Sequence, residues 1–98
     1  MAKRLTSVFT NDMDTCFFTG STEVERHHIF GASNRVHSEQ YGFVVPLRPD
    51  LHPNGARADK RYAKAIDTHL KQMAQEYFEA HYGSREKFMK TFGRNYLD

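Results

Sequence analysis

Residues 16–52, CFFTGSTEVERHHIFGASNRVHSEQYGFVVPLRPDLH, decide the fold of this chain. Three short stretches of aromatic and β-branched residues, at 16–19, 24–29 and 42–47, alternate with turn residues such as Gly20-Ser21. The segment between the second and third stretches is rich in Gly, Ser and Asn. Short apolar stretches bounded by turn residues are typical of β-strands. We therefore expect short strands and a hairpin, with an irregular loop before the last strand.

The second half of the chain carries a helical pattern. After Pro53-Asn54-Gly55, apolar residues recur every three or four positions, at Tyr62, Ile66, Leu70, Met73, Tyr77 and Phe78. This spacing places them on one helical face. It predicts a helix over about 58–81 that ends at Gly83, followed by a shorter helix that begins at Ser84 and ends at Gly93. The expected class is α+β, with strands first and the helical stripe as core beneath the hairpin.

Length and composition limit the function classes. The chain has 98 residues, 39% hydrophobic and 27% charged, which suits one globular domain and excludes a large multidomain enzyme. Its apolar runs are far shorter than a membrane span, and the start lacks an apolar signal region. We expect a cytosolic protein that does not enter membranes. With Cys16 as its only cysteine, the chain cannot form an internal disulfide or a four-thiolate zinc site.

Charge permits nucleic-acid binding but does not require it. The net charge is +2, and the basic surplus lies in the C-terminal half, where nine Lys and Arg stand against six Asp and Glu. Arg35 and Arg57 are the best candidates for DNA contacts, because a guanidinium group matches phosphate oxygens. The alternative for both is an ordinary solvated surface arginine.

Histidine is the unusual feature, with six in 98 residues. His27 and His28 end a predicted strand, and His52 follows at what we expect to be the start of a helix. Neighbouring strand residues point to opposite sides, so one histidine can bind metal while the other faces substrate. Neutral imidazole serves as metal ligand and as general base near neutral pH. The alternative is one core histidine and one exposed histidine.

Residues 16–52, with their HH pair, R-x-x-SE-x-YG, apolar strand and PxxH element, resemble the HNH, or ββα-metal, endonuclease motif. The tail LKQMAQEYFEAHYGSREKFMKTFGRNYL is similar to the C-terminal helices of small phage and prophage members of that family. The resemblance implies a single domain over 1–98, with a hairpin-plus-helix metal core at 16–60 and C-terminal helices at 58–97.

The resemblance also assigns roles to residues. His27 and His52 would bind one divalent cation, and His28 would be the general base that activates water. The ion would be Mg²⁺, with Mn²⁺, Ni²⁺ or Zn²⁺ as alternatives. The implied activity is hydrolysis of DNA phosphodiester bonds by a phage protein in the cytoplasm of a bacterial host.

Departures from the family pattern leave alternatives open. Many members hold a structural zinc with two CxxC pairs, whereas here Thr19, Arg48 and Leu51 stand where three of the thiols would be. We expect packing of Phe17, Phe18, Phe30, Phe43 and Val45 to replace that zinc, with Cys16 as an inert buried thiol.

The family's middle Asn is also missing. Asn34 is the nearest candidate to orient the general base, although it suits an ordinary turn equally well. Asn54 and Asp59 are candidates for a third metal ligand, and water can serve instead. A catalytically degenerate HNH-like module that binds nucleic acid or inhibits a host defence protein is the main alternative function, and a small structural zinc protein is a third.

Overall fold

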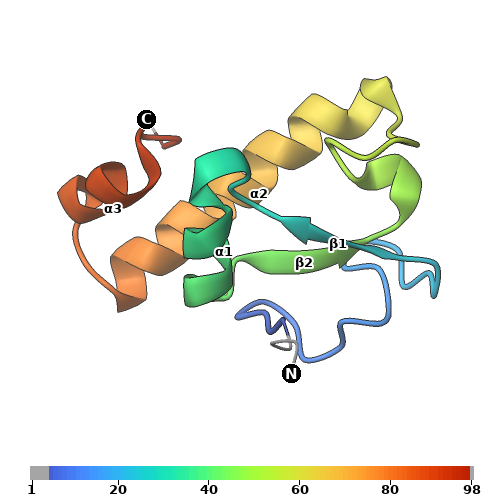
Figure 1. The fold of residues 1–98 in the computed structure, drawn as a ribbon, viewed down its shortest axis with the longest axis horizontal. Helices are drawn as coiled ribbons and strands as arrows, with labels where there is room; N and C mark the ends of the chain where they lie inside the picture. Colours follow the sequence, from blue (N-terminus) through green and yellow to red (C-terminus); the bar gives the residue numbers. More distant parts are fainter. Residues whose placement is uncertain (1–4, 98) are drawn as a thin grey trace.

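The antiparallel pair of strands lies against one long helix, and two shorter helices gather at the far end of that helix (Figure 1). This is a computed structural model, and it describes residues 5–97. The elements, in chain order, are strand β1 (Glu25–His28), 3-10 turn η1 (Ala32–Asn34), helix α1 (Arg35–Tyr41), strand β2 (Val44–Leu47), 3-10 turn η2 (Pro49–Leu51), helix α2 (Lys60–His81) and helix α3 (Arg85–Phe92). The predicted α+β class, with a strand pair followed by helices, is confirmed.

The strand register is set by burial. β1 pairs with β2 so that His27 faces Val45 and His28 faces Val44. All four residues of β2 are buried, whereas β1 is buried only at His27. β2 therefore lies inside the molecule, and β1 lies at the edge of the core with His27 buried and its other three residues partly or fully exposed.

Two sequence-based expectations about this region were wrong. The segment before β2 is not an irregular loop, because it contains η1 and α1. Gly42 ends α1 with a φ of +76°, a conformation that glycine adopts without strain. Residues 16–19 form a turn rather than a strand, although the amide of Phe17 donates to the carbonyl of Pro46 and fixes this turn on β2.

The C-terminal helices follow the predicted pattern closely. α2 begins at Lys60 instead of 58, because the Asp59 side chain accepts a hydrogen bond from the amide of Arg61 and caps the helix. Ser84 caps α3 in the same way, and Gly93 ends it with a φ of +96°. Tyr62 lies on the exposed side of α2, so the buried stripe begins one turn later than predicted.

The core is largely aromatic. It brings together residues of β2, α2 and α3 and of the segments that follow β1 and precede β2: Ile29, Phe30, Phe43, Val45, Leu47, Leu70, Ala74, Phe78, Phe88 and Phe92. Phe17 packs at its edge, but Phe18 is 43% exposed and does not take the structural role expected of it. Among the described residues, no helix is long and apolar enough to cross a membrane.

Candidate metal centre

The rings of His27, which is buried, and His52, which is partly buried, are in contact at the edge of the core. Their ring centroids lie 4.9 Å apart, edge to face. His27 comes from the middle of β1, whereas His52 follows η2 and precedes α2 by eight residues, so the expectation that His52 begins a helix was wrong. The strand pairing and the η2 turn together bring these two imidazoles into contact.

His27 is held as a neutral imidazole. It is only 2% exposed, and its Nε2 atom is buried without a hydrogen-bond partner. Burial, followed by the nearby positive charges of His52, His28 and Lys71, lowers the pKa of His27 to about 3. An uncharged imidazole with an unused lone pair is the form that binds metal ions.

A carboxylate fixes the orientation of His52. Glu25 Oε1 lies 2.7 Å from His52 Nδ1, with the Glu25 side chain 40% exposed and the His52 side chain 20% exposed. Glu25 stands two residues before His27 on β1, so both side chains leave the same face of the strand. Bonding at Nδ1 leaves Nε2 of His52 as its available ligand atom, an arrangement common for metal-binding histidines.

Gly55 makes room for this pair. A Cβ atom at Gly55 would lie 3.0 Å from both Glu25 Oε1 and His52 Nδ1. The dipeptide Asn54-Gly55 therefore does more than form a turn, because any larger residue at position 55 would press on the Glu25–His52 hydrogen bond.

His28 faces a different carboxylate. Its Nε2 atom lies 3.3 Å from Oε2 of Glu39 on α1, within ion-pair distance but without hydrogen-bond geometry. The His28 side chain is only 11% exposed. His28 thus has an acidic neighbour that can orient its ring.

Ser38 anchors the helix that carries Glu39. The Ser38 hydroxyl is fully buried, accepts from the amide of Phe30 at 2.9 Å and donates to the carbonyl of Phe30 at 2.7 Å. These two bonds fix α1 to the chain just after β1. Glu39 is consequently held opposite His28 by a rigid connection.

The three histidines open into one shallow hollow of about 210 Å³, which we call the histidine hollow. Its lining is Arg26, His27, His28, Gly31, Ala32, Arg35, His52 and Asn54. Arg35 therefore lies beside the histidines. Arg57 does not line this hollow, because its guanidinium pairs with Glu23 at 2.8 Å on the surface.

Asn34 lies away from His28. Its side-chain amide donates to the carbonyl of Phe92 at 3.0 Å and ties the end of α3 to η1. This contact gives Asn34 a structural role, and Glu39 lies beside His28, where the sequence suggested Asn34. Of the two candidates for a third metal ligand, Asp59 caps α2 and pairs with Arg61, and it does not line the histidine hollow. Asn54 does line it.

The side chains of residues 5–97 do not by themselves complete a metal site. Within residues 5–97, no three His, Cys, Asp or Glu side chains gather closely enough to hold a metal ion. His27 and His52 fit a cation by their chemistry, since His27 has an unused buried Nε2 and His52 is oriented by Glu25. Water, substrate phosphate or Asn54 would have to supply the remaining ligands.

The turn at Cys16 holds together without a metal. Cys16 is 4% exposed, as expected, and its Sγ accepts a hydrogen bond from the amide of Arg48 at 3.2 Å. Burial raises the pKa of the thiol, but hydrogen bonds, led by that of the Thr19 side chain, outweigh burial and lower it. Positions 16, 19 and 48, where three family thiols would stand, are thus joined by hydrogen bonds.

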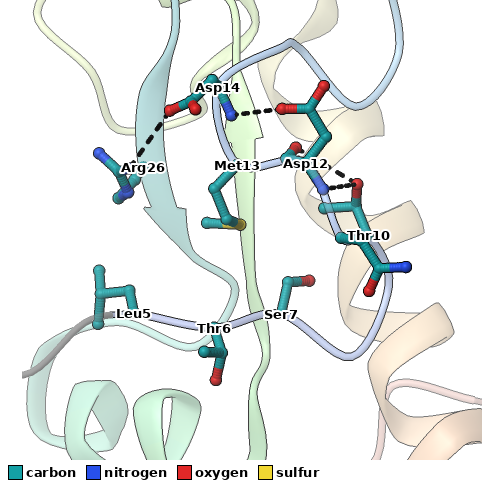
Figure 2. Close-up of a pocket in the computed structure, with 9 residues that line it drawn as sticks. Leu5, Thr6, Ser7, Thr10, Asp12, Met13, Asp14 and Arg26 are labelled. Atoms are coloured by element: carbon teal, nitrogen blue, oxygen red, sulfur yellow. Dashed lines mark hydrogen bonds and ion pairs between the residues drawn. The ribbon is translucent and has the colours of Figure 1, made fainter.

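A larger hollow of about 310 Å³ lies outside this centre, between the N-terminal segment and β1 (Figure 2). There the Arg26 guanidinium turns toward Asp14, 3.8 Å away, and Asp12 bonds to its own loop through Asp14 and Thr15. These carboxylates are used within the loop. The histidine hollow is smaller but holds the unpartnered imidazole nitrogens, so it is the better candidate site.

Glu25, Glu39 and Gly55 were missed as site residues by sequence reasoning. The signal for Glu25 was its position two residues before His27 on a strand, which places both on one face. Comparison with models of protein families, with curated proteins and with solved structures finds no match to this chain.

Proposed function

We propose that this protein is a divalent-metal-dependent endonuclease of the HNH type that hydrolyses phosphodiester bonds in DNA. One observation carries the proposal: the buried, unpartnered Nε2 of His27 lies beside a second imidazole, His52, whose Nδ1 is bound by a carboxylate. A binding module has no evident need to leave a buried imidazole nitrogen unsatisfied, because an unpartnered buried polar atom costs stability.

In this proposal His27 and His52 hold the cation. A bound divalent ion neutralises charge that develops on the phosphate and on the leaving oxygen. Mg²⁺ is the proposed ion, and the imidazole ligands also suit Mn²⁺, Ni²⁺ and Zn²⁺. Glu25 keeps the His52 ring in place, and the burial of His27 keeps its imidazole neutral well below neutral pH.

His28 is the proposed general base. With Nε2 turned toward Glu39, Nδ1 takes a proton from water as the water oxygen attacks phosphorus and the 3′-oxygen leaves. The carboxylate of Glu39, 3.3 Å from Nε2, stabilises the imidazolium that this step forms. Glu39 therefore acts as a positioning residue, in the place that the family's Asn would hold.

Arg35 is the proposed phosphate contact closest to the reaction, because it lines the histidine hollow. Arg57 remains a DNA contact only in the sense of a surface cation, since Glu23 already neutralises it. The proposed setting is a phage protein acting in the cytoplasm of a bacterial host, and it rests on family resemblance.

One observation favours a second candidate. The two-histidine centre lacks a third protein ligand among the described residues, as a degenerate HNH-like module would. Such a module would bind nucleic acid, or a protein of the host defence, without cutting.

Cleavage of supercoiled plasmid distinguishes the two candidates. The protein is incubated with Mg²⁺, Mn²⁺ or Ni²⁺, beside EDTA and a His28→Ala variant. The endonuclease proposal predicts nicking that requires metal and that falls roughly 10²- to 10⁴-fold in the variant. Equal nicking by parent and variant would remove His28 from the mechanism, and no nicking with any of the metals would favour the binding module.

A further inference from the structure

A second hollow continues the histidine hollow. It measures about 260 Å³ and is lined by Phe30, Gly31, Ala32, Asn34, Asn54, Lys71 and Tyr96. Gly31, Ala32 and Asn54 line both hollows, so the two form one continuous depression, which we call the trough. The trough runs from the histidines toward the segment after α3, which lies near the start of α1 (Figure 1).

The lining of the trough contains cations but no carboxylate, although Arg26 and Lys71 pair with Asp14 and Asp67, which lie outside the lining. Its lining includes Arg26, Arg35 and Lys71, and none of its lining residues is Asp or Glu. The chain contains twelve Asp and Glu, almost as many as its fourteen Lys and Arg, so a lining without carboxylates is a local property. A groove with cationic walls favours an anionic ligand.

Gly31 and Ala32, which line both hollows, form the middle of the trough. A Cβ atom at Gly31 would meet nothing within 4 Å, so this residue leaves open space above the backbone. Its neighbour Ala32 has a φ of +51°, in the left-handed region that non-glycine residues rarely adopt. Strain of this kind persists only where surrounding contacts hold it, and it concentrates at functional segments.

Two cations lie near the Tyr96 ring at the far end, where Lys71 lines the trough and Arg94 lies outside its lining. The Lys71 Nζ atom lies 5.4 Å, and the Arg94 guanidinium carbon 5.0 Å, from the centroid of the Tyr96 ring. At these distances the ring attracts both charges. Lys71 also pairs with Asp67 at 3.0 Å. No ion pair within residues 5–97 includes Arg94.

Tyr96 is fixed in place by α2. Its amide donates to Gln75 Oε1 at 2.7 Å, and its carbonyl accepts from Gln72 Nε2 at 3.1 Å. Gln75 is fully buried, so this attachment is rigid. The ring therefore holds Lys71 and Arg94 at a constant position relative to α2, which also carries part of the core.

No Asp or Glu lines the trough, and two cations lie near the Tyr96 ring. We infer that Lys71 and Arg94, positioned by Tyr96, bind a phosphate group of the DNA strand that neighbours the phosphate hydrolysed at the histidines. This site rests on the proposed function, because it takes the same nucleic-acid strand as the histidine centre. It gives the strand a direction across the surface, from the histidines over Gly31 and Ala32 to Tyr96. The ligand is a phosphodiester of the bound DNA.

The test measures binding of duplex DNA by fluorescence anisotropy in EDTA, over a series of salt concentrations. The variant Lys71→Met/Arg94→Met removes both charges and keeps apolar stems. The matched control, Lys64→Met/Lys90→Met, removes two exposed charges from α2 and α3 that do not line the trough. Each lost phosphate contact should flatten the slope of log K against log salt by about 0.9 and weaken binding about eightfold at 0.1 M salt.

We expect the trough variant to lose both contacts and the control to bind like the parent. The variant Lys71→Arg/Arg94→Lys keeps both charges and should bind like the parent. It therefore tests the role of the charges even if the methionine variant folds poorly. Equal affinity of the trough variant and the control would overturn the phosphate site, while plasmid cleavage by the parent would still support the proposed function. Conversely, salt-dependent binding that requires Lys71 and Arg94, in a protein that does not cut, would support the site and overturn the endonuclease. A parent that binds no DNA at low salt would overturn the site as well.

Discussion

Removing the carboxylate of Glu25 should weaken metal binding although Glu25 is not a proposed ligand. Its Oε1 lies 2.7 Å from His52 Nδ1, so Glu25→Ala frees the ring to rotate and to change tautomer. Loss of such a partner costs about 10- to 100-fold in metal affinity, which is about 1.4–2.7 kcal/mol. Glu25→Gln keeps an acceptor oxygen and should fall between Ala and the parent.

Glu23→Ala is the matched control. Glu23 also accepts from a cation at 2.8 Å, but Glu23 and its partner Arg57 are 63% and 67% exposed. An exposed pair contributes roughly 0–1 kcal/mol to stability and nothing to the orientation of His52. Calorimetric titration with Mn²⁺ measures the affinity of each variant. Equal affinities for Glu25→Ala and Glu23→Ala would refute the view that Glu25 orients a metal ligand.

Three further predictions follow from the same geometry. Glu39→Ala should lower kcat for DNA nicking roughly 10- to 100-fold with little change in KM, because Glu39 acts through His28. Glu39→Gln should recover part of the lost kcat. A rise in KM as large as the fall in kcat would indicate a DNA contact instead. Gly55→Ala should lower Mn²⁺ affinity about tenfold, because its Cβ would press on the carboxylate–imidazole bond, whereas Gly31→Ala, which meets nothing within 4 Å, should leave that affinity unchanged. In EDTA, the unfolded His27 protonates below its ordinary pKa of 6.5 while the folded one stays neutral to about 3. The free energy of unfolding should therefore decrease as the pH is lowered from 6.5 toward 3, by up to about 1.4 kcal/mol per pH unit more in the parent than in His27→Leu. Denaturant titrations measure this free energy, and parallel plots against pH for the two proteins would contradict the burial of a neutral imidazole.

The helices were predictable because their signals are local. Ser84 and Gly93 bound α3 as predicted, since a cap requires only one side chain or one left-handed residue at the right place. The strands were predictable in outline, with β1 and β2 inside the expected stretches. Helix α1 was missed because a tertiary contact stabilises it. The Ser38 hydroxyl bonds to the backbone of Phe30, eight residues earlier in the sequence, and no local pattern indicates this contact.

The candidate site was only partly predictable. Adjacent histidines and a distant His52 indicated a metal centre, and the structure brings His27 and His52 together. The partners of the histidines are tertiary: Glu39 comes from a helix that was read as a loop, and Asn34 bonds to Phe92 at the end of another helix. No spacing rule reveals such pairs before the fold is known.

The melting temperature with and without metal tests the metal centre most directly. A ligand present at one hundred times its Kd stabilises the folded state by about 2.7 kcal/mol, which for a domain of this size is a rise of roughly 10–20 °C. The measurement compares millimolar Mn²⁺ with EDTA for the parent, for His52→Ala and for His69→Ala, an exposed histidine of α2. We predict that Mn²⁺ raises the melting temperature of the parent and of His69→Ala but not of His52→Ala. Identical melting temperatures of the parent in Mn²⁺ and in EDTA would contradict the existence of the centre.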